Sequence, residues 1–242
     1  MMALMAQRNS MQPAGAARRQ RDLWELCVGY GLILLVLWTP RPLQTVLYFA
    51  TIAVLLAMFR ASFEGWTAMG LRGANFFRSL WVVGVAGLLA ALAILLALRL
   101  RTLHAPHGPL PFLKTYGGYV VWSLAQQILL LDFFLSRLLR LLPGRNSAVG
   151  ATAGIFALAH LPNPVLTPLT LLWGLAACLL FLRYRNLYPL AMAHAIFGIC
   201  VAITVPAPVC HHMRVGLGYL QYRPTARVSA ATATRSYPRR HG

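Results

Sequence analysis

Seven apolar segments, separated by short connections that contain proline and arginine, dominate this sequence. A helix needs about 20 apolar residues to cross the hydrocarbon core of a bilayer, and inside lipid it satisfies its own backbone hydrogen bonds. Only 11% of the residues are charged, whereas about 25% are charged in a typical soluble domain. We therefore predict an all-α fold, a multispanning membrane helix bundle with about seven (six to eight) transmembrane helices. The predicted spans cover residues 23–38, 45–59, 79–100, 119–135, 148–161, 165–182 and 188–209.

The charge of the chain is strongly positive. Lysine and arginine together number 22, against four aspartates and glutamates, and the net charge is +18. In a soluble protein this excess would suggest nucleic-acid binding, but here the basic residues lie mostly between apolar segments and in the two tails. We therefore expect a lipid bilayer as their partner, and no nucleic acid. Arginines in 1–22, 60–78, 137–145 and 183–185 favour one common side for these segments, the cytoplasm, and hence a cytoplasmic N-terminus.

Four regions follow from these patterns. We expect a basic N-terminal tail at 1–22, transmembrane helices and loops at 23–118, a core of helices at 119–209, and a basic C-terminal tail at 210–242. Before residue 119, Glu25 is the one carboxylate within a predicted span, and we expect it at the membrane interface. Polar side chains inside a bilayer are costly and often functional. Because nearly all the others lie in 119–209, we expect any site there.

Two adjacent glutamines lie within the apolar segment 119–135. Gln126 shares a helical face with Trp122, and Gln127 lies on the neighbouring face. Regular helix geometry aims Asp132, five residues further on, away from both glutamines, so only local unwinding of the helix would bring the carboxylate to them. The pair is equally compatible with a polar site and with hydrogen bonds that hold two membrane helices together.

The segment 148–161 combines two patterns. Gly150 and Gly154 form a G-x-x-x-G pattern, which allows another helix to pack closely. Phe156 and His160 are four residues apart and therefore share a face, and His160 lies just before Pro162, which ends the segment. A histidine in this position is either a hydrogen-bonded residue at the interface or part of a site.

Small residues surround His194 in the segment 188–209. Ala191, Ala195, Gly198 and Ala202 lie on its stripe of the predicted helix, so another helix can approach closely and bury the imidazole. A buried imidazole can donate a hydrogen bond, accept a proton or bind a metal, or it can simply pack. Three polar features on three spans of one half favour a shared site.

These three segments together resemble the CPBP family of membrane proteins, which is related to the CAAX prenyl endopeptidase. Members carry Glu-Glu-x-x-x-Arg, then Phe-x-x-x-His, then His-x-x-x-Asn/Asp on successive motif helices. Here Gln126-Gln127, Phe156-x-x-x-His160 and His194 occur in that order, over roughly residues 119–200. The resemblance implies an integral membrane protein of the bacterial cytoplasmic membrane and a CPBP-like core at 119–209.

The resemblance also implies roles for single residues. The implied site consists of catalytic His160, His194, Gln126 and Gln127, and of substrate-positioning Phe156 and Gly198. Either no cofactor is required, or a divalent metal such as zinc is bound by the two histidines. The chain departs from the family pattern at both glutamates, at the arginine, where it has Leu131, and at the Asn/Asp, where it has Gly198. An amide cannot act as a general base near neutral pH, although it can hold a water molecule.

Three functions are compatible with this pattern. The first is an endopeptidase that hydrolyses a peptide bond of a peptide or membrane protein at a divergent site centred on His160 and His194. The second is a pseudoprotease that has the same fold and binds a membrane partner without cutting it. The third is a small transporter, which the absence of a visible inverted repeat disfavours.

Overall fold

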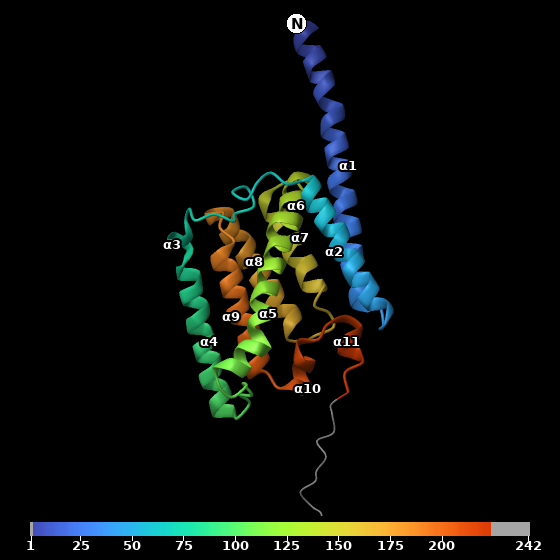
Figure 1. Cartoon of the computed structure of the whole chain (residues 1–242). Coiled ribbons are helices and arrows are strands. Elements are labelled where there is room, and N and C mark those ends of the chain that lie inside the picture. The colour runs from blue at the N-terminus through green and yellow to red at the C-terminus, as the bar shows by residue number, and fades with distance from the viewer. Residues whose placement is uncertain (1, 224–242) are drawn as a thin grey trace, which may run out of the picture.

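The computed structural model describes residues 2–223, and every regular element in this range is helical, which confirms the expected all-α fold. The elements are α1 (Met2–Trp38), α2 (Leu43–Ala61), α3 (Phe76–Ser79), α4 (Trp81–Leu100), α5 (Pro109–Gln127), the π-helix η1 (Ile128–Leu135), α6 (Ser136–Leu141), α7 (Arg145–Leu158), α8 (Leu166–Tyr184), α9 (Tyr188–Thr204), α10 (Ala207–Cys210), the short 3₁₀ turn η2 (His211–Met213) and α11 (Gly216–Leu220). Part of the predicted C-terminal tail, residues 224–242, lies outside the described residues. Figure 1 shows a bundle from which the beginning of α1 projects at one end.

Among residues 2–223, four helical segments are long and apolar enough to cross a membrane: α2, Phe76–Leu100, Pro109–Leu141 and α8. The pair α9 and α10 would add a fifth span, although the two helices are bent by 119°. The predicted number of about seven is therefore not confirmed in full. The apolar run at 23–38 shares α1 with Asp22 and Glu25, and the run at 148–161 forms α7, which has 14 residues. A helix of that length spans about 21 Å, less than the hydrocarbon core of about 30 Å.

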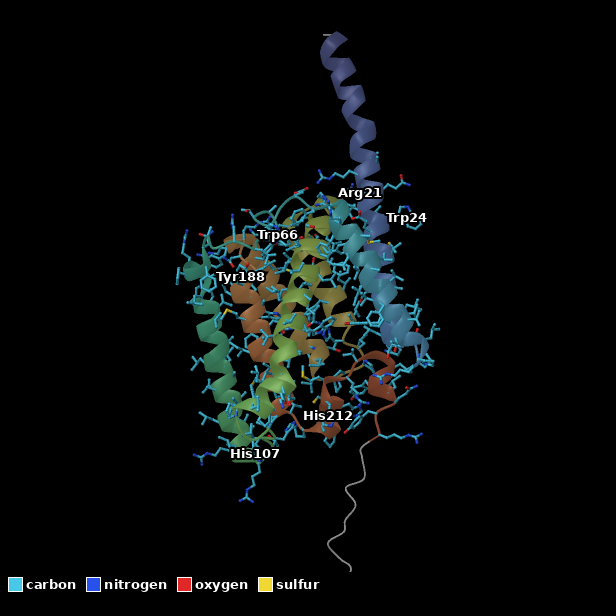
Figure 2. All side chains as sticks on the ribbon, in the orientation of Figure 1. Arg21, Trp24, Trp66, His107, Tyr188 and His212 are labelled. Carbon is cyan, nitrogen blue, oxygen red and sulfur yellow. The ribbon has the colours of Figure 1, made fainter. Side chains whose placement is uncertain are left out.

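The outward faces of the bundle are apolar. Leucines that are more than half exposed cover one face of α4: Leu88, Leu92, Leu95 and Leu96. In Figure 2, Trp24, Trp66 and Tyr188 lie toward the end from which α1 projects, and His107 and His212 lie toward the opposite end. Tryptophan and tyrosine are enriched where membrane meets water. The chain is therefore an integral membrane protein.

Small residues bring α7 and α8 together. A Cβ added to Gly174 of α8 would lie 3.1 Å from the Cα of Ala153 on α7, so these backbones approach closely. The predicted close contact at Gly150 and Gly154 is wrong, because a Cβ at either glycine would meet no atom within 4 Å. The glycine that permits the contact lies on the partner helix, which the pattern within α7 could not reveal.

The small-residue stripe of α9 is buried around His194, as predicted, and Ala202 at its far end is half-buried. This helix packs against both α4 and α5. Ala191 is 6% exposed, Ala195 5% and His194 itself 5%, and Gly198 is also buried. The imidazole of His194 is therefore enclosed between neighbouring helices.

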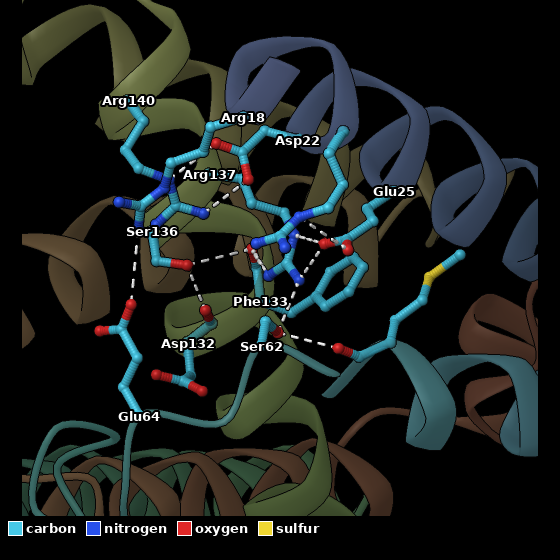
Figure 3. A network of polar contacts seen from close by, with 12 residues as sticks. Arg18, Asp22, Glu25, Ser62, Glu64, Asp132, Phe133, Ser136, Arg137 and Arg140 are labelled. Carbon is cyan, nitrogen blue, oxygen red and sulfur yellow. Dashed lines mark hydrogen bonds and ion pairs between the residues drawn. The ribbon is translucent and has the colours of Figure 1, made fainter. Parts of the chain in front are cut away.

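All four carboxylates of the chain lie near one end of the bundle (Figure 3): Asp22, Glu25, Glu64 and Asp132. Asp22 of α1 accepts hydrogen bonds from Nε and Nη2 of Arg140 at 2.7 and 2.8 Å. Burial acts to raise the pKa of Asp22, but the hydrogen bonds and charge of Arg140 outweigh it and keep this pKa below its ordinary value. Glu25 accepts from Nε of Arg137 at 2.7 Å, and the two side chains are 8% and 2% exposed. Glu25 is thus buried in an ion pair that joins α1 to α6.

The beginning of the predicted C-terminal tail is held against the turn that follows α7. The amide of Gly216 donates to the carbonyl of Leu161 at 2.7 Å. The fully buried Asn163 donates its amide hydrogens to the carbonyls of Cys210 and Arg214, at 2.8 and 3.0 Å. These bonds hold the turn 159–164 in place, and that turn contains His160.

Replacing Glu25 by glutamine should destabilise the protein, because it leaves the guanidinium of Arg137 buried without a countercharge. Breaking one partner of a buried pair lowers the free energy of unfolding by about 3–5 kcal/mol. The matched control is Glu64→Gln. Its pair with Arg18 has exposed side chains, so its removal should change stability by less than about 1 kcal/mol. Thermal unfolding in detergent micelles measures both, and equal melting temperatures for Glu25→Gln and wild type would contradict the assignment.

Candidate functional site

The best-defined polar contact in the bundle interior joins α5 to α9. Nε2 of Gln127 lies 2.9 Å from Nδ1 of His194, and the two side chains are 0% and 5% exposed. An amide nitrogen can only donate a hydrogen bond. Nδ1 of His194 is therefore the acceptor, and the proton of the neutral ring lies on Nε2.

In His160 the ring proton is assigned to the other nitrogen, Nδ1. It lies in the turn directly after α7, where its Nδ1 is 2.7 Å from the carbonyl oxygen of Phe156. Since a carbonyl can only accept, Nδ1 of His160 carries the proton and Nε2 has a free lone pair. The helical spacing of Phe156 and His160 creates this bond, because the carbonyl one turn earlier in the chain points toward the ring.

Aromatic rings enclose the two imidazoles. The ring centroid of Phe156 lies 4.9 Å from that of His160 and 5.9 Å from that of His194. Trp173 of α8 lies 6.1 Å from His194, also between centroids. The structure therefore gathers Gln127, Phe156, His160 and His194 around one apolar-walled site. Trp173 could not be identified from the sequence, because no spacing pattern in α8 distinguishes it.

Tyr119 occupies the space beside Gly198. A Cβ added to Gly198 would overlap the Tyr119 hydroxyl, and the Tyr119 ring centroid lies 6.4 Å from that of His194. Tyr119, Ser123 and Gln127 are spaced four residues apart and so share one face of α5, a pattern that could have identified Tyr119 in advance. Gly198 makes room for this tyrosine, and its role in positioning substrate stays a prediction.

Gln126 and Asp132 are not part of this contact. Gln126 is half-buried, and it has no hydrogen bond to either histidine in the described part of the chain. The α-helical pattern does change directly after Gln127, where η1 begins. Even so, Asp132 lines a separate cavity of about 760 Å³, together with Glu64 and arginines that include Arg137 and Arg140. The carboxylate therefore does not replace the missing glutamates at the histidines.

That cavity is the second polar feature of the molecule (Figure 3). Three of the four nearby carboxylates have an arginine partner, and Asp132 has no hydrogen bond to its carboxylate among the described residues. The hydroxyl of Ser136 bonds to the backbone carbonyl of Asp132, not to its side chain. The cavity thus carries charges of both signs and lies at the arginine-rich end of the bundle.

A metal ion would find too few ligands at the histidines. Catalytic zinc usually has three protein ligands, and no group of three histidine, cysteine, aspartate or glutamate side chains suited to a metal occurs among residues 2–223. Of the two rings only His160 has a free lone pair, on Nε2, because Nδ1 of His194 accepts from Gln127. The donor set does not fit a catalytic zinc ion.

The close fit of Tyr119 against Gly198 can be tested by adding one methyl group. Gly198→Ala should lower the free energy of unfolding by about 1–3 kcal/mol, the usual effect of overpacking, and Tyr119→Ala in the same chain should relieve the overlap. Gly154→Ala is the matched control, since its Cβ meets open space and alanine favours a helix. If Gly198→Ala and Gly154→Ala melt at the same temperature, Tyr119 does not occupy this position.

The chain was compared with known families, with curated proteins and with solved structures. A model of the type II CAAX prenyl endopeptidase Rce1-like family matches residues 8–200, that is, 193 of 242 residues. No curated protein and no solved structure matches the chain. The matched range contains the glutamine pair and both histidines of the site, and it confirms the resemblance seen in the motifs. The chain belongs to the Rce1-like family of type II CAAX prenyl endopeptidases.

Proposed function

We propose that the chain is a CPBP-type integral-membrane endopeptidase whose divergent site is centred on His160 and His194. One observation carries this proposal: Nδ1 of His194 lies against an amide nitrogen and Nδ1 of His160 lies against a carbonyl oxygen, which assigns opposite tautomers to the two rings. The Phe156 carbonyl leaves a lone pair on Nε2 of His160, and Gln127 leaves a proton on Nε2 of His194. Hydrolysis of a peptide bond needs both a base that activates water and a donor for the oxyanion.

The reaction uses these two atoms in turn. Nε2 of His160 accepts a proton from a water molecule while the water oxygen attacks the carbonyl carbon of the peptide. Nε2–H of His194 donates a hydrogen bond to the oxyanion that forms. When the C–N bond breaks, the proton on His160 passes to the leaving nitrogen, so that a carboxyl and an amine product result and His160 regains its lone pair.

The other predicted residues take supporting roles in this proposal. Gln127 holds His194 in the tautomer that donates, and Gln126 holds water at the position of the family's first glutamate. Phe156 lies between the two imidazoles and contacts the substrate peptide. Gly198 contributes indirectly, because its lack of a side chain lets Tyr119 enter the site.

The proposal also implies a class of substrate and a location in the cell. The substrate is a peptide or membrane protein whose cleaved bond reaches the site from the bilayer or its interface. We place the chain in a bacterial cytoplasmic membrane with the N-terminus in the cytoplasm, because positive connections favour that side. Arg18, Arg137 and Arg140 then all lie at the cytoplasmic end.

Cleavage of membrane-anchored peptides by the protein in proteoliposomes tests the proposal. His160→Ala should lower kcat by about 100- to 10,000-fold, the usual contribution of a general base, and His194→Ala should lower it through loss of the oxyanion donor. His107→Ala, in the exposed loop before α5, is the matched control and should cleave normally. If the double variant His160→Ala/His194→Ala cleaves as fast as wild type, the site is not catalytic. If wild type binds peptide but never cleaves it, the pseudoprotease alternative is correct.

Gln127→Glu should reduce activity, although it restores a glutamate of the family motif. A carboxylate only accepts hydrogen bonds, so it would move the proton of His194 to Nδ1 and leave Nε2 without a donor. Removal of one oxyanion donor lowers kcat by about 100- to 1,000-fold. Gln221→Glu, at an exposed glutamine outside the site, is the control and should cleave at the wild-type rate. A higher rate for Gln127→Glu than for wild type would overturn the assigned tautomer.

A further inference from the structure

Two buried polar atoms beside His194 have no hydrogen-bond partner among the described residues: Oε1 of Gln127 and Nε1 of Trp173. Gln127 is fully buried, and its amide nitrogen is already used by His194. The ring of Trp173 lies against the same imidazole, 6.1 Å between centroids. Buried polar atoms in folded proteins nearly always have a partner. An acceptor and a donor left unpaired around one residue point to a ligand.

These two atoms differ from the other unpaired ones. The remaining atoms of this kind are the hydroxyl oxygens of Thr51, on α2, and Thr167, in the first turn of α8. A hydroxyl hydrogen rotates to suit its surroundings. An indole N–H is fixed in the plane of its ring, and an amide oxygen is fixed by the bond that its own nitrogen makes. The two unpaired atoms beside His194 therefore provide one donor and one acceptor, each with a fixed direction.

We propose that this pair binds the peptide unit that is cleaved. Oε1 of Gln127 accepts a hydrogen bond from the peptide N–H, and the indole N–H of Trp173 donates to the peptide C=O. A peptide unit presents one donor and one acceptor, which matches the pair. This inference rests on the proposed endopeptidase function and makes Trp173 a catalytic residue, since its N–H touches the carbonyl oxygen as that oxygen becomes an oxyanion.

The indole is held in place from two sides. Gly174, the next residue, packs against the backbone of Ala153 on α7, and a Cβ there would also lie 3.5 Å from the Phe156 ring. The ring of Trp173 packs against Phe197 of α9 with centroids 5.3 Å apart. A donor that is fixed before substrate binds needs no reorganisation during the reaction. Trp173 and His194 together supply two donors to the oxyanion.

Trp173→Phe tests the proposal, because it keeps an aromatic ring and removes only the indole N–H donor. The assay is cleavage of a membrane-anchored peptide in proteoliposomes, and kcat/KM should fall about 100-fold, in part through a higher KM, because the N–H also contacts the carbonyl of the bound substrate. A peptide with a thioamide at the cleaved bond has a weaker acceptor, so the variant should lose much less with that substrate. A purely structural role for Trp173 would affect both substrates equally. The control is Trp122→Phe, an exposed tryptophan on α5, which should cleave both normally.

A binding measurement separates this inference from the proposed function. In a His160→Ala background, in which cleavage should be at least about 100-fold slower, addition of Trp173→Phe should weaken binding of a fluorescently labelled form of the peptide about tenfold, as expected for one lost hydrogen bond. The thioamide peptide should bind His160→Ala less tightly than the amide peptide, which tests the carbonyl contact without altering Trp173. If wild type never cleaves but both binding effects occur, the endopeptidase function fails and the peptide site stands. If wild type cleaves but Trp173→Phe changes neither kcat/KM nor binding, the inference is wrong.

Discussion

Inside a bilayer no water is available to satisfy a buried polar group, so each such group must find a partner within the protein. This constraint organises the bundle. Glu25 of α1 is paired with Arg137 of α6, and Asn163 bonds to the backbone carbonyls of Cys210, at the end of α10, and Arg214. Ser123 and Thr152, both fully buried, donate to the carbonyls one turn earlier in their own helices. The bonds of Glu25 and Asn163 also fix which distant segments lie together.

The same constraint explains how the site can work with amides. A buried carboxylate would bring a charge that must be paired or hydrogen-bonded, and the four carboxylates of the chain all lie elsewhere, near the arginine-rich end. The amide of Gln127 is neutral, yet it still selects one tautomer of His194. The backbone carbonyl of Phe156 selects the other tautomer for His160. Two neutral rings thus acquire opposite hydrogen-bonding roles without any nearby charge.

Part of this arrangement could be predicted from the sequence. The order of the motifs led to Gln127, Phe156, His160 and His194, and these residues lie together, although their catalytic roles stay predictions. Helical spacing could not tell which glutamine meets His194. Trp173 was not predicted, because a tryptophan in an apolar helix has no distinguishing sequence pattern. Only the tertiary structure shows that its buried N–H has no partner among the described residues. The close packing assigned to the glycines of α7 belongs to Gly174 of α8.

The sequence by itself determined that the chain is helical, lies in a membrane and concentrates its polar residues in 119–209, because hydropathy and spacing are properties of local segments. The tertiary structure alone decided that Gln127 rather than Gln126 reaches His194, and that Asp132 lines a different cavity. It also decided that Tyr119 fills the space beside Gly198. These contacts depend on how each helix is rotated and how far it is shifted along its neighbour. Small residues on the partner helix set both, and no single segment contains that information.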